Sequence, residues 1–198
     1  VLFVGQAMPA VKRHPHHWPS LNVWLYSIGL TDKDIQENFK YTALVNYFPG
    51  YQEKGGHKVP TKEETANESE RLKKTITDFN PEVLVTIGKL SLTYCLNQKI
   101  NKLDDNYIGK TFNVNPYGML GKEIIVIPLP HPSGASTWIY KEGNKLLLQK
   151  ALSILKNNLQ KSLTIPIAYF KPDSIIYHCY AQTYYLLLTI HLLSCHLK

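Results

Sequence analysis

The sequence predicts an α/β protein: a three-layer α/β/α sandwich with a central four-stranded, mostly parallel sheet. Two observations lead to this prediction. Four short apolar runs are typical of strands buried on both faces, and each is followed by a segment with helical spacing. The 198 residues, 44% of them hydrophobic, are also enough for one domain with a substantial core. In such folds, ligands bind at the carboxyl ends of the parallel strands.

The first half of the chain supplies two of the four predicted strands. Residues 1–5, VLFVG, form an apolar run closed by a glycine, and residues 41–48, YTALVNYF, end before Pro49-Gly50. Between them, a loop rich in Pro and His leads into a helix over residues 21–30. Its apolar residues recur on one helical face: Leu21, Trp24, Leu25 and Ile28.

The second half repeats the alternation. A capping box at Thr61 to Glu64 begins one long surface helix over residues 61–79, which Asn80-Pro81 ends. The remaining predicted elements are a strand over 82–88, a short helix over 89–96, a strand over 123–129 and an amphipathic helix over 144–159. Residues 97–122 are polar and irregular, with room for short strands.

The composition changes after Ser162, so we predict a domain over residues 1–162 and an apolar, Tyr- and Leu-rich tail over residues 163–198. The longest uncharged apolar run of the tail, residues 184–193, is too short for a dependable membrane span. We favour a poorly structured appendage. A packed extra helix, or an anchor for a membrane or a partner, stays open as an alternative.

The bulk properties narrow the class of protein. Three cysteines without a CxxC motif indicate a reducing compartment rather than a disulfide framework. The start at Val1 leads us to expect further residues upstream, and VLFVG is too short for a signal peptide. We expect a monomer without a membrane partner, in the cytoplasm with the nucleoid, or in the nucleus of a eukaryote. The net charge of +7 is compatible with nucleic acid but does not establish it.

The most unusual residue at the predicted strand ends is His131, in the stretch PLPHPSGAS after the strand over 123–129. Pro130 and Pro132 stiffen its backbone. A ring fixed at a strand end can direct an N–H group at developing negative charge. The alternative is a purely structural histidine, and the residues alone leave both open.

Several motifs occur together in a fixed order: VGQAMP after the first strand, TALVNYFPG, KVPTKEE, PEVLVTIGK and PLPHPSGAS. In this combination the chain resembles the uracil-DNA glycosylase superfamily, nearest to the bacterial and archaeal branches called families 4 and 5. The resemblance covers about residues 1–159. It implies hydrolysis of the N-glycosidic bond of a damaged base that is flipped out of DNA into a pocket.

The resemblance also implies roles for individual residues. His131 matches the histidine that donates a hydrogen bond to the leaving base. Gln6 and Ala7 match the loop that lines the pocket and positions the attacking water. Residues 133–137 match the loop that enters the minor groove, with a small apex. The residues of that loop that we expect on DNA are Ser133, Gly134, Ala135 and Ser136.

The chain departs from the resemblance at the positions that activate water and choose the base. The first motif has Gln6 where some relatives have a carboxylate, and Met8 is inserted. After Thr42 stands Ala43, where family 4 has a base-reading asparagine. Asn46 can replace that asparagine only if the register changes or the strand has ended before it. Hypoxanthine and xanthine therefore join uracil as candidate bases.

Family 4 also carries a four-cysteine iron–sulfur cluster, whose cysteines are not present at the matching positions of this chain. Cys95 cannot hold a cluster alone, so we expect no cofactor. His14, His16 and His17 have no fourth ligand at a recognisable spacing, so we expect no metal.

Other side chains of the same loops complete the predicted site. Trp18 either stacks on the flipped base or fixes its loop to the core. Basic residues expected to meet phosphates are Lys12, Arg13, Lys54, His57 and Lys58. Two further functions remain compatible with the sequence: a catalytically weak or inactive DNA-binding relative, and a small-ligand binding module of similar α/β architecture.

Overall fold

The computed structural model describes residues 1–163 except residues 12, 54–55 and 134–136, and it describes side chains as far as residue 160. Within the chain, contacts define one compact unit over Val1–Lys161 and a second over Ser162–Lys198. The predicted apolar tail lies outside the described residues, so the predicted boundary at residue 162 stays a prediction. In the described part, no helix is long and apolar enough to cross a membrane.

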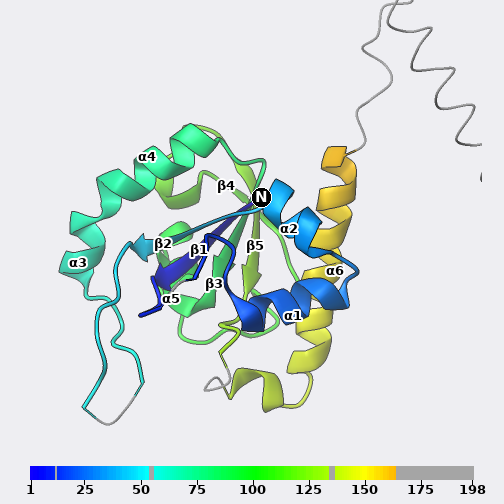
Figure 1. Cartoon of the computed structure of the whole chain (residues 1–198), viewed down its shortest axis with the longest axis horizontal. Helices are drawn as coiled ribbons and strands as arrows, with labels where there is room; N and C mark the ends of the chain where they lie inside the picture. Colours follow the sequence, from blue (N-terminus) through cyan, green and yellow to red (C-terminus); the bar gives the residue numbers. More distant parts are fainter. Residues whose placement is uncertain (12, 54–55, 134–136, 164–198) are drawn as a thin grey trace, which may run out of the picture. The chain divides into compact units, whose positions relative to one another are not determined.

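The described unit has a mixed α/β fold built on a single sheet in the order β2-β1-β3-β5-β4 (Figure 1). Its strands are β1 (Leu2–Ala7), β2 (Lys40–Val45), β3 (Val83–Ile87), β4 (Phe112–Val114) and β5 (Ile124–Leu129). The first, second, third and fifth are parallel. The parallel α/β sandwich predicted from the sequence is confirmed.

The sheet has five strands, one more than predicted. The additional strand, β4, pairs antiparallel with β5, with Phe112 opposite Val126 and Val114 opposite Ile124. It lies in the polar stretch 97–122. Three residues are too few to show an alternating pattern, and only the neighbouring strand makes this segment extended.

Helices cover both faces of the sheet (Figure 1). On one face α1 (Pro19–Ser27), α2 (Asp32–Asn38) and α6 (Asn144–Leu163) enclose a core that includes Phe3, Val85 and Ile127. On the other face α4 (Ser69–Phe79) and α5 (Gly88–Cys95) pack on strand residues of the opposite parity, such as Val4 and Leu84. Successive strand residues thus enter different cores, as a fully covered sheet requires.

Helix α2 was not predicted, although the sequence carries a signal for it. The Thr31 side chain accepts a hydrogen bond from the Asp34 backbone, and the Asp34 carboxylate accepts one from the Thr31 backbone at 2.8 Å. This capping box satisfies two backbone donors at the first turn. The segment is short, and only Ile35 among its residues is buried, which weakens its apolar periodicity.

The long helix predicted over residues 61–79 is instead two helices, α3 (Lys62–Asn67) and α4, which meet at Glu68. The capping box at Thr61 and Glu64 is confirmed, and so is the end at Asn80, which adopts a left-handed conformation. At the junction the Glu68 carboxylate accepts hydrogen bonds from the Asn46 backbone and from Arg71. The interruption therefore coincides with a contact to the end of β2, which no local pattern encodes.

Arg71 joins α4 to the open edge of the sheet. Its guanidinium donates to the carbonyl oxygens of Ala43 at 2.6 Å and Leu44 at 3.2 Å, and to the Thr42 hydroxyl at 3.1 Å. Its Nε lies 2.6 Å from the Glu68 carboxylate. Strand β2 is an edge strand, with a neighbouring strand on one side only. The Arg71 side chain therefore fixes α4 to the backbone of this edge strand.

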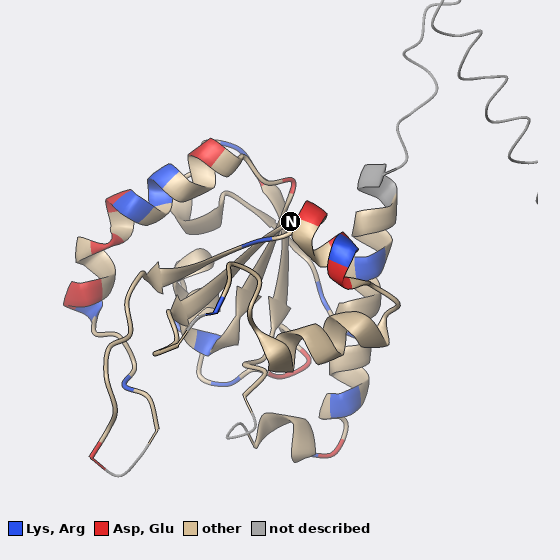
Figure 2. Ribbon diagram, in the orientation of Figure 1, with Lys and Arg blue, Asp and Glu red and all other residues tan. Residues whose placement is uncertain are grey.

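The rest of the α3–α4 surface is ordinary. Basic and acidic residues are mixed along the two helices in Figure 2, and Lys74 pairs with Asp78 across one exposed turn at 2.8 Å. Mixed charges of this kind are typical of a solvated helix face.

We predict that Arg71→Ala lowers the free energy of unfolding by about 2 kcal/mol, because charged donors to partly buried carbonyl groups are lost. Arg71→Lys should recover only part of this, since an ammonium cannot reproduce the planar fork. Urea unfolding at neutral pH measures both. Lys73→Ala, on the exposed side of the same helix, is the matched control and should change little. Equal effects of the substitutions at residues 71 and 73 would contradict the role of Arg71.

Candidate active site

A cavity of about 280 Å³ opens at the carboxyl ends of the parallel strands. Its walls come from β1 and the loop after it, from the start of α1, from β2 and the loop after it, and from the turn after β5. The lining residues are Gly5, Gln6, Ala7, Met8, Pro9, Val11, Pro15, His17, Trp18, Pro19, Ser20, Tyr41, Thr42, Phe48, Pro49, His57, Lys58, His131 and Ser133. We call this cavity the rim pocket.

His131 directs a neutral imidazole at the rim pocket. The Ser133 backbone N–H donates to its Nδ1 at 3.2 Å, so Nδ1 is the acceptor and the proton of the neutral ring is on Nε2. Burial lowers the pKa of His131 below its ordinary value of 6.5, and the nearby His57 lowers it further. At neutral pH the ring is therefore an uncharged N–H donor with a fixed tautomer.

Gly88 and Trp18 are neighbours of His131. Gly88, with φ of +83°, joins β3 to α5, and a Cβ added there would lie 3.7 Å from the Cβ of His131. The Trp18 ring lies 6.2 Å from the imidazole, measured between ring centroids. A glycine at residue 88 fits both the backbone conformation and the contact with the histidine.

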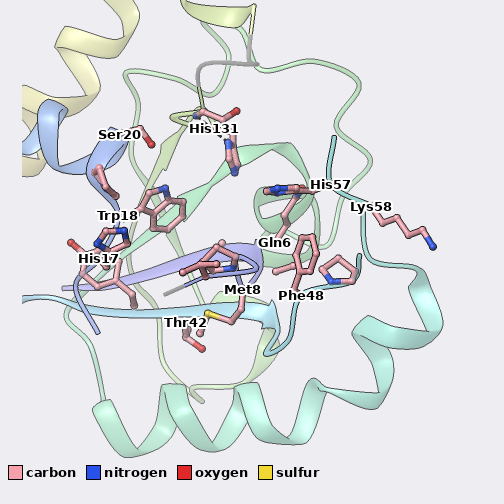
Figure 3. Close-up of a pocket in the computed structure, with 18 of the residues that line it drawn as sticks. Gln6, Met8, His17, Trp18, Ser20, Thr42, Phe48, His57, Lys58 and His131 are labelled. Atoms are coloured by element: carbon pink, nitrogen blue, oxygen red, sulfur yellow. Dashed lines mark hydrogen bonds between the residues drawn. The ribbon is translucent and has the colours of Figure 1, made fainter. Parts of the chain in front are cut away.

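Trp18 forms one wall of the rim pocket, opposite Phe48 and His57 (Figure 3). Its ring lies over β1, where a Cβ added to Gly5 would come within 3.3 Å of it. It also packs against the core that contains Phe3. The two roles left open by the sequence are therefore compatible: the ring fixes its loop to the core and presents a flat apolar surface to the cavity.

The first motif lies at the end of β1. The strand continues to Ala7, and the Met8 backbone N–H donates to the carbonyl oxygens of Val45 and Tyr47, each at 3.2 Å. Gln6 lines the pocket between the end of β1 and His57 (Figure 3). Met8, which reads as an insertion, thus extends the contact between β1 and β2.

The loop after β2 contributes pocket residues that the sequence did not mark as such. Phe48 and His57 line the cavity, with their ring centroids 5.1 Å apart. His57 was expected to meet phosphates, and Phe48 was only part of the motif TALVNYFPG. An aromatic residue at the very end of a predicted strand, just before Pro49-Gly50, was the available signal. The pairing of His57 with Tyr51, which places His57 at the pocket, is not visible in the sequence.

Two residues expected in the base pocket lie elsewhere. Ala43 is buried in the sheet, and Thr42 is the residue of that pair that lines the rim pocket. Strand β2 ends at Val45, so Asn46 lies beyond the strand as its expected role required. Asn46 is nevertheless exposed and absent from the pocket wall, because its backbone is bound to Glu68 on the side of α4.

The expected DNA-binding residues divide into three groups. Ser133 and Lys58 line the rim pocket, although the Lys58 ammonium extends away from its interior (Figure 3). Arg13 is exposed and lies outside the lining. The last group lies outside the described residues: Lys12, Lys54, Gly134, Ala135 and Ser136.

The candidate metal and cluster residues are dispersed. The His14 and His17 rings contact each other edge to face, whereas His16 Nε2 lies 3.0 Å from the Phe39 carbonyl oxygen. Cys95 is buried in the core on the far face of the sheet, where burial raises the pKa of its thiol to about 12. Across the described ranges, no three His, Cys, Asp or Glu side chains gather as metal ligands would.

The fold and the site define an α/β protein with an aromatic-walled pocket and a neutral histidine at the carboxyl edge of its sheet. The chain belongs to the Uracil DNA glycosylase superfamily, whose family model matches residues 1–156. No curated protein matched the chain. Membership of this superfamily supports a glycosylase type of activity, with DNA as the partner.

The pKa of His131 predicts how stability depends on pH. Because the folded-state pKa lies below the ordinary 6.5, the unfolded chain binds this proton more readily. The free energy of unfolding should therefore fall as the pH drops through and below 6.5. Urea unfolding between pH 7.5 and pH 5 should show a smaller fall for His131→Asn than for the wild type. Identical pH dependence of the two proteins would contradict the buried, neutral ring.

Proposed function

We propose that the protein is a monofunctional DNA glycosylase that hydrolyses the N-glycosidic bond of uracil, or of another deaminated base, flipped out of DNA for base excision repair. The observation that supports this most directly is the neutral, tautomer-fixed His131 beside the aromatic wall of the rim pocket. Superfamily membership over residues 1–156 supports the reaction type.

The proposed reaction uses His131 to stabilise the leaving group. As the bond between the sugar and the base breaks, the bonding electrons pass to the base and negative charge collects on its carbonyl oxygens. The His131 Nε2–H donates a hydrogen bond to one of these oxygens. Its neutral form suits this role, because a donor fixed in a partly dry site stabilises charge without first losing solvent. Trp18 supplies the flat surface for the base.

Water is the second reactant, and Gln6 is the residue proposed to hold it. The amide oxygen accepts a hydrogen bond from water and orients it toward the sugar. A neutral amide is a poor base, so the proton that water loses as it adds to the sugar passes to the anionic departing base, directly or through solvent. None of the described lining residues is acidic. The positive charge on the sugar is then balanced by the departing base and the DNA phosphates rather than by a protein carboxylate.

The same absence of an acidic side chain from the described lining favours a second candidate function: a DNA-binding relative with weak or no catalysis.

The Lys58 ammonium extends away from the pocket interior (Figure 3), so it is not positioned to attack the sugar. We therefore expect an intact abasic site as the product, without strand cleavage.

The assay that tests the proposal uses single-stranded and duplex DNA carrying uracil, hypoxanthine or xanthine, followed by hot alkali. We predict cleavage of at least one substrate, and a loss of at least roughly 100-fold in rate for His131→Ala. His14→Ala, which removes a histidine that is not itself part of the pocket lining, is the control and should retain the wild-type rate. DNA binding without base release would favour the second candidate. No DNA binding at low salt would rule out both.

The role of Gln6 makes a separate prediction. If water activation limits the rate, Gln6→Glu should raise the single-turnover rate by roughly tenfold, since a carboxylate can accept the proton of water. Gln6→Leu, which removes both amide groups at similar volume, should lower it. A lower rate for Gln6→Glu than for the wild type would show that the missing carboxylate is not what slows the reaction.

A further inference from the structure

The loop after β2 folds back on itself beside the rim pocket. The Lys58 N–H donates to the Gly50 carbonyl oxygen, and the Gln52 N–H donates to that of Gly56, both at 2.9 Å. Tyr51 pairs with His57 in an antiparallel bridge. The Gln52 side chain adds a hydrogen bond to the His57 carbonyl oxygen at 3.0 Å. These bonds fix the backbone that carries residues 51, 57 and 58.

Three rings of this loop contact one another, and we call Phe48, Tyr51 and His57 the aromatic cluster. The ring centroids lie 4.8 Å apart for Phe48 and Tyr51, 5.1 Å for Phe48 and His57, and 5.6 Å for Tyr51 and His57. All three pairs meet at steep angles, as aromatic pairs prefer. The cluster is thus held together by its own packing.

The cluster has an inner and an outer side. Phe48 and His57 line the rim pocket, whereas Tyr51 is absent from the lining and 62% exposed. An aromatic ring fixed by its neighbours yet open to solvent loses little conformational entropy when it binds a ligand. The outer ring therefore suits contact with something that lies beside the pocket rather than in it.

Exposed apolar side chains concentrate around this position. Among the described residues, half of the large hydrophobic side chains left exposed come from the loops after β1 and β2: Val11, Tyr47, Tyr51 and Val59. The ammonium of Lys58 extends outward beside the cluster (Figure 3). The same loop also contains one acidic residue, Glu53. A flat aromatic group joined to an anion matches this combination of rings and lysine.

We propose that the aromatic cluster is a second stacking surface, on which Tyr51 holds an unpaired nucleobase next to the flipped nucleotide. This rests on the proposed function, because the stacked base belongs to the same DNA strand as the nucleotide that is flipped into the rim pocket. The ligand is single-stranded DNA, or duplex DNA opened around the lesion. Tyr51 would act through the face of its ring, so the contact is tolerant of base sequence.

The test is binding of a short undamaged single-stranded DNA, measured by fluorescence anisotropy at low salt. Loss of one stacked base should weaken binding by about tenfold in Tyr51→Ala. Tyr51→Phe, which keeps the ring, should bind as the wild type does. Tyr26→Ala removes an exposed tyrosine ring of α1 and is the matched control. The inference is wrong if Tyr51→Ala binds like the wild type, or if Tyr26→Ala loses as much.

Salt dependence separates stacking from phosphate contacts. Lys58→Ala should reduce the slope of log K against log salt by about 0.7, the value for one phosphate contact on a single strand. Tyr51→Ala should leave the slope unchanged, and a flatter slope would overturn the stacking role. Tyr51→Trp adds a direct readout, because its extra fluorescence should be quenched by DNA, and unquenched emission at saturation would also count against stacking.

These measurements do not depend on base release. If no damaged base is excised but binding still depends on the ring at residue 51, the proposed catalysis fails and the stacking surface stands. If excision depends on His131 but Tyr51→Ala binds normally, the stacking surface alone is wrong.

Discussion

The rim pocket depends on the parallel pairing of β1 with its neighbours. Because Gly5 lies opposite Ala43, and because β3 pairs with both β1 and β5, the strands end at one edge of the sheet. Three segments far apart in the chain therefore meet there: the first motif after β1, the loop after β2 and the turn that carries His131. Arg71 supports this arrangement from α4, since its guanidinium binds backbone carbonyl oxygens of the edge strand β2.

Burial of the pocket histidine links the fold to the chemistry. The surroundings that pack the His131 ring against Trp18 and close to Gly88 also remove water from it, and this lowers the pKa of the ring. The backbone of Ser133 then selects the tautomer. A single turn between two prolines thus fixes the charge, the proton position and the direction of the donor, which are the properties that a leaving anionic base requires.

Short sequence patterns predict some elements of the fold and of the candidate site but not others. The four parallel strands, the capping box at Thr61 and the place of His131 after a buried strand all follow from short, local patterns, and the structure agrees with them. Helix α2, the short strand β4 and the break at Glu68 are different. Each is short, or depends on a partner far away in the sequence, so local periodicity carries little information about it.

The sequence by itself determined the α/β class, the superfamily resemblance, the positions of Gln6 and His131 at strand ends, and that of Trp18 in the loop after the first strand. The tertiary structure decided which neighbouring side chains face the cavity: Phe48 and His57 do, while Ala43 and Asn46 do not. The physical reason is that the direction of these side chains depends on the residue at which β2 ends and on how the following loop pairs with itself. The residue after β2 is bound to the distant Glu68, and the loop pairs within itself through backbone groups, so neither contact leaves a pattern of side chains in the sequence.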